Sequence, residues 1–197
     1  MVAWIGQQLV GEWNLMTGQT SENLAYHAAR LLLLIEICGK PRKGRTAPGI
    51  EGRTLLAKFD FFIRYPLYLK KAAAILQQVF SDDDLGLTLS GETGSVESHM
   101  VRYLYGPWDH VYYSTLAYLV GKGLIVIEMA RGVETFRLTP KGQSITTQLL
   151  QDHAYADLAR RADTAYHLFN KYTGSRLKDF IYAYFPEVVS RELGASI

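Results

Sequence analysis

Acidic side chains gather most densely in one loop-like segment, residues 81–94, which contains Asp82, Asp83, Asp84 and three glycines. Consecutive carboxylates could hold a divalent cation, and together with Glu92 they could serve a metal-dependent nuclease. Neighbouring residues of one loop do not converge on an ion without ligands from elsewhere, and the spacing of a calcium-binding loop is absent. We therefore favour a solvated acidic loop, with the metal site and the nuclease as minor alternatives.

The remaining chemistry-bearing residues form no recognisable catalytic constellation. The sequence has no glycine-rich phosphate loop, no HExxH or CxxC spacing and no GxSxG turn, and its five histidines are scattered. Asp109 and His110 are adjacent, and adjacent residues on a helix do not face each other, so Asp109 is better placed as a helix N-cap. We expect no enzymatic activity, no metal, no cofactor and no small-molecule substrate.

One loop offers a local basic cluster on a chain whose formal net charge is only +2. The cluster comprises Lys40, Arg42, Lys43 and Arg45, and no acidic residue occurs between positions 39 and 50. A flexible basic loop can contact DNA phosphates, which gives a salt-sensitive and sequence-independent affinity. The other interpretation is a solvated connection. We slightly favour the DNA contact.

The composition is that of an ordinary globular protein, with 48% hydrophobic and 20% charged residues over 197 positions, enough for one domain or two small ones. Cys38 is the single cysteine and follows an apolar run, so we expect a buried, reduced thiol. The N-terminus lacks the pattern of a signal peptide, and no apolar run reaches the ~20 residues that span a bilayer. We expect a cytoplasmic protein with no membrane contact.

The segment 100–141 follows the order of a winged-helix unit: strand, helix, hairpin, helix. Gly106-Pro107 predicts a turn after the first strand, Arg131 lies at the hairpin tip, and Thr139 caps the last helix with Pro140 in its first position. The expected elements are a strand over 101–105, a helix over 109–120, hairpin strands over 124–129 and 133–138, and a helix from 140.

Around this unit the sequence predicts mainly helices, so the fold class is mainly α with a small β-hairpin. The expected helices cover 22–38, 53–65, 67–80, 151–172 and 175–185, the last with Ser175 as its cap. We divide the chain into an N-terminal arm (1–20), a helix-turn-helix-like unit (21–94), a winged helix-turn-helix unit (95–150) and C-terminal helices (151–197). Because the segment 21–94 also resembles a helix-turn-helix, the chain could contain two winged-helix units in tandem. The aromatic C-terminal helices either pack on the domain or contact another subunit.

Three stretches carry a family resemblance: AKFDFFIRYPLYL at 57–69, VRYLYGPWDHVYY at 101–113 and FRLTPKG at 136–142. In this order they resemble the middle component of ABC-type three-component systems, the Lamassu-type anti-phage defence group. More broadly, they resemble winged-helix accessory subunits of SMC-like complexes. The resemblance covers about residues 25 to 145, and its first two motifs are the distinctive ones.

The resemblance implies a non-catalytic subunit that bridges an SMC-like ATPase and an effector nuclease and contacts double-stranded DNA through the complex. Residues that match the family motifs are Asp60, Arg64, Tyr65, Tyr105, Trp108, Asp109 and His110. In the structural interpretation, which we favour, Asp60 pairs with Arg64 one helical turn away and Trp108 anchors the core. In the other interpretation Tyr105 and Trp108, with Tyr112 and Tyr113, face a partner.

The main alternative is a free-standing winged-helix transcriptional regulator, in which the helix over 109–120 would enter the major groove of DNA. This helix offers tyrosines, Ser114 and Thr115, and no Lys or Arg occurs before Lys122. We therefore rank the regulator second, and expect DNA contact at the basic loop and at Arg131 instead.

Overall fold

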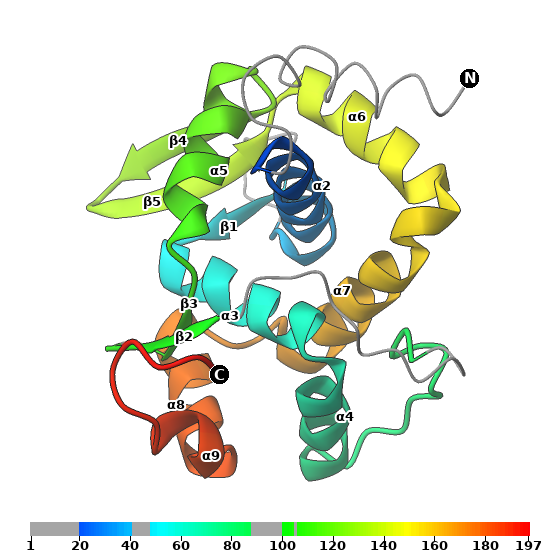
Figure 1. Ribbon diagram of the computed structural model, residues 1–197. Coiled ribbons are helices and arrows are strands. Elements are labelled where there is room, and N and C mark those ends of the chain that lie inside the picture. Colours follow the sequence, from blue (N-terminus) through cyan, green and yellow to red (C-terminus); the bar gives the residue numbers. More distant parts are fainter. Residues whose placement is uncertain (1–19, 41–47, 88–99, 105) are drawn as a thin grey trace.

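The computed structural model describes residues 20–40, 48–87, 100–104 and 106–197 (Figure 1). The described chain is mainly helical, with two small antiparallel sheets. The helices are α2 (Thr20–Cys38), α3 (Arg53–Arg64), α4 (Pro66–Ile75), α5 (Val111–Gly121), α6 (Pro140–Gln151), α7 (Ala156–Phe169), α8 (Gly174–Tyr184) and α9 (Pro186–Val189), with a 3-10 turn at His153–Tyr155. The strands are β1 (Gly49–Glu51), β2 (Val101–Tyr103), β3 (Gly106–Trp108), β4 (Ile125–Ala130) and β5 (Val133–Leu138).

Helix α2 forms the centre of the molecule, with the sheet, α3, α6 and α7 arranged around it (Figure 1). Its apolar run from Leu31 to Ile35 is buried on every face, each residue being at most 2% exposed. The continuous apolar run requires such a position, because a helix that is hydrophobic all round must be covered all round. Cys38 is buried at the end of α2 as expected, and burial raises the pKa of its thiol.

The described core is one cluster of buried residues that runs from Ala28 to Val188. Residues from the segments 21–94, 95–150 and 151–197 all contribute to it. The aromatic C-terminal helices therefore pack on the rest of the chain, which is the first of the two alternatives for them. Phe62 of α3 stacks on Phe169 of α7 at 4.7 Å between ring centroids, and Phe185 is fully buried.

The three-stranded sheet has the order β1-β5-β4 and is antiparallel throughout. The predicted hairpin is confirmed, with Ile125 opposite Leu138 and Ile127 opposite Phe136. At its tip Arg131 (φ 51°) and Gly132 (φ 77°) both have positive φ, which the two-residue turn of a tight hairpin demands. Strand β1 was not expected, because it lies in the glycine- and proline-rich segment that we interpreted as a loop.

A second, two-stranded sheet replaces the predicted turn at Gly106-Pro107. Both residues belong to β3, which pairs with β2 so that Val101 lies opposite Trp108 and Tyr103 opposite Gly106. A strand of a two-stranded sheet has a free edge, so it tolerates a proline that cannot donate a hydrogen bond. Helix α5 consequently begins at Val111, later than the sequence indicated.

Two helix boundaries also differ from expectation. Helix α4 ends at Ile75 rather than near residue 80, because Gln77 adopts a left-handed conformation (φ 55°). Helix α8 is capped by Thr173 rather than Ser175, with the Thr173 side chain accepting a hydrogen bond from the amide of Arg176. The predicted cap at Thr139 is confirmed: its side-chain oxygen accepts from the amide of Gly142 at 3.0 Å.

The predicted helix over 151–172 is interrupted at its start. Asp152 is extended and caps the 3-10 turn by accepting from the amide of Ala154, and α7 begins only at Ala156. Among the described helices, none combines the length and apolarity needed to cross a membrane. The predicted N-terminal arm lies outside the described residues.

Candidate functional site

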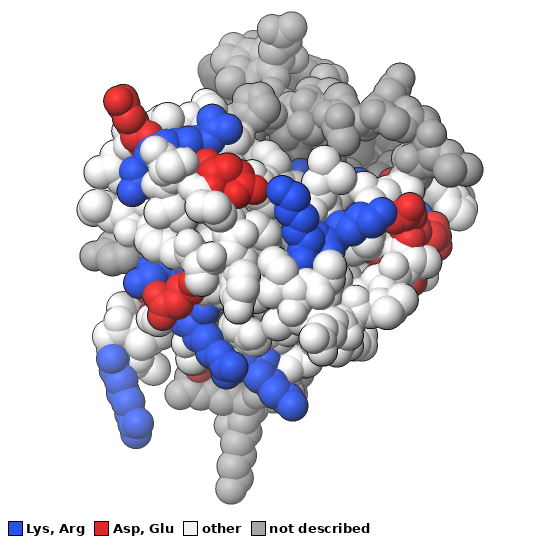
Figure 2. All heavy atoms as spheres, turned by 90° about the horizontal axis from the view of Figure 1, so that it is seen from below, with Lys and Arg blue, Asp and Glu red and all other residues white. Residues whose placement is uncertain are grey.

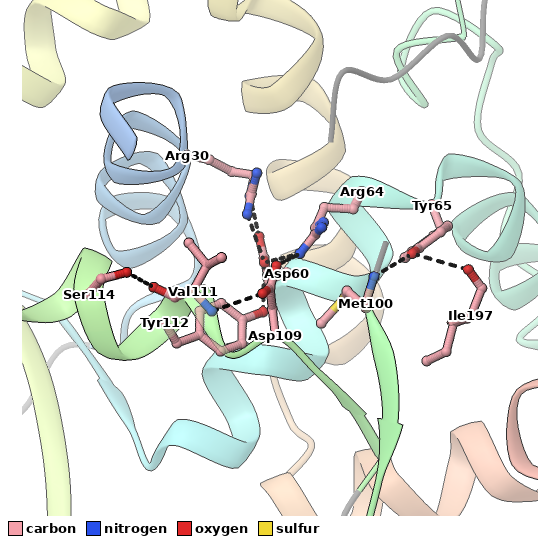
Figure 3. A network of polar contacts seen from close by, with 10 residues as sticks. All are labelled: Arg30, Asp60, Arg64, Tyr65, Met100, Asp109, Val111, Tyr112, Ser114 and Ile197. Carbon is pink, nitrogen blue, oxygen red and sulfur yellow. Dashed lines mark hydrogen bonds and ion pairs between the residues drawn. The ribbon is translucent and has the colours of Figure 1, made fainter. Parts of the chain in front are cut away.

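A buried network of charged side chains joins α2, α3 and the start of α5 (Figure 3). At its centre the fully buried carboxylate of Asp60 accepts hydrogen bonds from Arg30 Nε at 2.6 Å and from Arg30 Nη2 at 3.2 Å. The Tyr112 hydroxyl donates to the same carboxylate at 2.7 Å. The predicted partner, Arg64, lies farther away, with 3.8 Å between Arg64 Nη1 and Asp60 Oδ2. Asp60 is thus paired mainly across helices, and only secondarily within α3.

Arg64 makes its shorter contact with Asp109, from its Nη1 to Oδ2 at 2.7 Å. The second carboxylate oxygen of Asp109 accepts from the amide of Val111 at 2.9 Å and so satisfies a free amide at the start of α5. The N-cap residue itself is His110, so the prediction of Asp109 as the N-cap is wrong by one residue. Asp109 thereby links the FDFFIRYP stretch to the YGPWDH stretch. Asp60, Arg64 and Asp109, three of the described residues that match the family motifs, are therefore in contact.

The network holds its members in defined protonation states. Burial alone raises the pKa of the Asp60 carboxyl. The charges of Arg30 and Arg64, with the hydrogen bonds from Arg30 and Tyr112, outweigh burial, so that the net shift is downward. Burial and the neighbouring Asp60 raise the pKa of Tyr112 well above its usual value. Asp60 therefore stays ionised and Tyr112 stays neutral, which keeps the donor and acceptor roles constant.

His27 lies on α2 near the same charges. Its side chain is buried, and burial, followed by the positive charges of Arg30 and Arg64, lowers its pKa to about 4. A neutral imidazole at physiological pH avoids placing a third cation beside the two arginines.

Tyr65 extends the polar contacts toward the C-terminus (Figure 3). Its hydroxyl accepts a hydrogen bond from the Met100 amide at 2.9 Å and lies 3.4 Å from the carbonyl oxygen of Ile197. The Ile197 amide in turn donates to the Met100 carbonyl at 2.7 Å. This network is structural, since each of its members is engaged within the chain.

A surface pocket of about 160 Å³ opens beside the network, between α3, the β2–β3 hairpin and α5. Aromatic rings form much of its wall and two basic residues complete it. Its lining comprises Arg53, Thr54, Ala57, Lys58, Tyr103, Gly106, Pro107, Trp108 and Tyr113. We take this pocket as the candidate functional site, because it combines a concave surface, aromatic walls and a buried cation.

Lys58 is the least expected member of the pocket. Only 1% of this residue is exposed, and its ammonium donates to the carbonyl oxygen of Thr54 at 3.1 Å. Burial, and then the positive charge of Lys178, lower the pKa of Lys58 to about 7. A lysine held in this way destabilises the fold at neutral pH, since its charge is only partly compensated.

Arg53 forms the outer part of the pocket wall and is fixed in place. Its guanidinium makes two hydrogen bonds to the Glu134 carboxylate of β5, at 2.6 and 2.7 Å. Its Cζ also lies 5.6 Å from the centre of the Tyr113 ring. Arg53 therefore connects the hairpin β4–β5 to α3 and leaves Lys58 as the unneutralised cation of the described lining.

The residues predicted to face a partner are distributed between surface and core. Tyr113 is 57% exposed and Trp108 is half-buried, with both rings lining the pocket 5.9 Å apart. Tyr112, which we also expected at an interface, is instead buried at 3% exposure, because its hydroxyl is needed by Asp60. Tyr105 lies outside the described residues. Trp108 also packs against the core, as the structural interpretation expected.

The predicted DNA contacts are separated where the structure describes them. Lys40 is exposed, and its backbone pairs with that of Gly49 in β1. Gly49 in turn pairs with Arg137, near the C-terminal end of β5. Arg131 lies at the far end of β5, roughly 20 Å away at ~3.3 Å per residue of strand. Arg42, Lys43 and Arg45 lie outside the described residues. Lys40 and Arg131 thus occupy opposite ends of the sheet.

The face formed by α4, α8 and α9 shows no continuous basic band (Figure 2). Its basic side chains stand in separate groups, and several have acidic partners: Lys70 binds Asp82 at 2.6 Å and Lys71 binds Glu187 at 3.1 Å.

The acidic loop holds no metal site within the described residues. Asp84 caps its own turn by accepting from the amide and hydroxyl of Ser81, and Asp83 lies 3.6 Å from Arg160. Glu92 lies outside the described residues. The described part of the loop thus uses its aspartates in local contacts.

Sequence reasoning missed Arg30, Lys58 and Arg53. A signal was present for the first two, because each is a lone cation inside an otherwise apolar helical run, and such a residue is rarely buried without a purpose. No sequence signal pairs Arg53 with Glu134, which is remote in the chain.

Comparison of the chain with protein-family models, with curated proteins and with solved structures finds no match.

Proposed function

We propose that this protein is a winged-helix accessory subunit that docks other proteins, bridging an SMC-like ATPase and an effector nuclease of an anti-phage defence complex. The observation that carries the docking role is the surface of α5. Its exposed residues include Tyr113, Ser114, Ala117 and Val120, and the helix contains no Lys or Arg. An aromatic pocket lies beside its first turn. Such a surface suits protein contact better than the major groove of DNA.

The winged-helix assignment is supported by the order of the elements. The first strand beside the hairpin is β1, and not the expected strand over 101–105, whose described part pairs with β3. Helix α2, strand β1 and helix α3 precede α5, and the hairpin β4–β5 follows it. The strand order β1-β5-β4 places the first strand beside the last, with β4 at the edge. In this assignment α5 occupies the place of the recognition helix and the Arg131 tip is the wing.

The identity of the partners rests on the family resemblance of the FDFFIRYP and YGPWDH stretches. The structure adds that these stretches are tied together through Asp60, Arg64 and Asp109. A rigid link between them would hold the pocket and α5 in a constant geometry, as a docking subunit requires.

Co-expression tests the docking role. The chain is produced with the products of the genes beside its own, purified through a tag on this chain, and analysed by light scattering after size exclusion. We expect a stable assembly that contains an SMC-like ATPase. Elution of this chain alone in the presence of such an ATPase would refute the proposal. Nanomolar, sequence-dependent binding of the isolated chain to one promoter fragment would favour the alternative, a transcriptional regulator.

The DNA contact is tested by replacing Lys40, Arg42, Lys43 and Arg45 together with Ala in the assembled complex. We expect weaker binding and a flatter dependence of affinity on salt, by about 0.9 in logarithmic slope for each phosphate that the variant no longer neutralises. The matched control replaces Lys70 and Lys71, whose charges already have acidic partners. An unchanged slope in the fourfold variant would remove the loop from the DNA interface.

A further inference from the structure

We infer that the pocket beside Lys58 receives the acidic side chain of a partner protein, with its carboxylate bound to the Lys58 ammonium and its methylene groups against the aromatic walls. The inference rests on the proposed docking function, since a partner subunit presents the side chain. It adds the chemistry of the contact and the residue that anchors it.

The first argument is the hydrogen-bonding state of Lys58. An ammonium group has three N–H donors, and within the described chain Lys58 uses one, to the Thr54 carbonyl oxygen. Two donors therefore remain on a group that is 1% exposed. A carboxylate would accept both and would also neutralise the charge, forming a short, charge-assisted contact.

Gly106 lies beside this ammonium and adds no side chain over it. A Cβ atom at this position would lie 3.5 Å from Lys58 Cε and 3.8 Å from Lys58 Nζ. The φ angle of Gly106 is +107°, a conformation that side-chain-bearing residues rarely adopt. The glycine of the YGPWDH stretch therefore lets β3 pass directly over the amine without covering it with a side chain.

The size and charge of the pocket fit one acidic side chain. A volume of about 160 Å³ accommodates a single side chain rather than a folded segment. The described lining contains Arg53 and Lys58 and no Asp or Glu, and Arg53 is already occupied by Glu134. Tyr103, Trp108 and Tyr113 offer ring surfaces for methylene groups, as in the anchor pockets of protein interfaces.

A nucleic-acid phosphate fits the same surroundings less well. Binding of a phosphate backbone needs a row of cations at the spacing of successive phosphates. Helix α5 beside the pocket has none, and the adjacent hairpin places Glu134 there. A protein side chain needs only the single cation that the pocket provides.

The experiment follows binding of capped amino acids to the full chain by NMR, at the backbone amide of Gly106 and the indole of Trp108. The probes are N-acetyl-glutamate amide and its neutral isostere N-acetyl-glutamine amide. We expect the acidic probe to bind in the millimolar range and at least about tenfold more tightly than the neutral one. Lys58→Met should remove this preference, while Lys70→Met, the same change at an exposed site, should retain it.

Three results would overturn the inference: equal binding of the two probes, no shift of either resonance with the acidic probe, or an acid preference that survives Lys58→Met. A thymidine dinucleotide that binds at these resonances more tightly than the acidic probe would reassign the pocket to nucleic acid.

A second arm separates this inference from the proposed function. In the complex obtained by co-expression, Lys58→Met should weaken association by about tenfold or more. A wild-type complex that Lys58→Met leaves unaffected refutes the pocket inference and leaves the docking function intact. Failure of the wild type to form any complex refutes the docking function, while the NMR titration still decides whether the pocket binds a carboxylate.

Discussion

Replacing Lys58 with Met should stabilise the isolated chain, although it removes a polar contact. The Lys58 pKa is about 7 in the folded chain against 10.5 for an unperturbed lysine. Between these values the unfolded chain binds more protons, so the free energy of unfolding of the wild type rises with pH from about 7 to about 10.5. Below pH 7 the buried charge destabilises the fold by its full amount.

The magnitude follows from the size of the shift. At ~1.36 kcal/mol per unit, the destabilisation is at most about 5 kcal/mol below pH 7 and slightly less at pH 7. Methionine keeps the unbranched stem of lysine against the core and removes the hydrogen bond to Thr54. We therefore expect Lys58→Met to raise the free energy of unfolding by about 2–4 kcal/mol at pH 7, and by much less at pH 10.

Urea unfolding followed by circular dichroism at pH 7 and at pH 10 measures this difference. The matched control is Lys70→Met, where the side chain is 52% exposed and a change within about 0.5 kcal/mol is expected at both pH values. A destabilised Lys58→Met variant, or a gain that is independent of pH, would refute the argument that a poorly compensated charge is buried there. Stabilisation combined with weaker partner binding would show that the lysine is retained for contact rather than for folding.

The remaining predictions concern the buried network and one helix cap. Asp60→Asn removes the anion that binds Arg30 and leaves Arg64 its contact with Asp109, so it should lower the free energy of unfolding by about 3–5 kcal/mol. In the same urea assay, Asp82→Asn on the surface should change it by less than about 1 kcal/mol. Folding lowers the pKa of His27 from 6.5 to about 4, so between these pH values the unfolded chain binds more protons than the folded chain. The free energy of unfolding of the wild type should therefore fall by up to about 3 kcal/mol as the pH drops from 6.5 to 4. The difference in this free energy between the wild type and His27→Gln should change with pH by the same amount, and a constant difference would contradict the argument. Thr139→Ala removes the N-cap of α6 and should lower the free energy of unfolding, measured by thermal unfolding, by about 1 kcal/mol. Thr147→Ala, at an exposed position of the same helix, should not lower it. Equal effects of the two substitutions would exclude capping as the cause.

The main helices and the hairpin could be predicted because their signals are local. The apolar run of α2, the Thr139-Pro140 start of α6 and the paired β-rich runs of β4 and β5 each depend on neighbours in the chain, and the structure has them within a few residues of the expected bounds. The prediction of a helix end was wrong where one residue adopts an uncommon backbone conformation. Gln77 ended α4 early in this way.

The candidate site was predictable only in part. Trp108 and Tyr113 were singled out from the VRYLYGPWDHVYY stretch, and both line the pocket. Tyr112 was predicted at an interface but is buried. Helical spacing shows that its side chain can face the core, but it does not show that Asp60 will accept a hydrogen bond from its hydroxyl there. Lys58 was overlooked because a lysine in a helix is usually on its solvated side.

The sequence by itself determined which segments become helices and hairpin strands, since those choices depend on periodicity, capping and turn residues within reach of one another. Only the tertiary structure decided that Arg30 rather than Arg64 is the closest partner of Asp60, that β1 joins the sheet, and that Gly106 lies over the amine of Lys58. Each of these contacts joins residues remote in the chain. Their energy depends on burial and distance in space, which no local pattern of residues specifies.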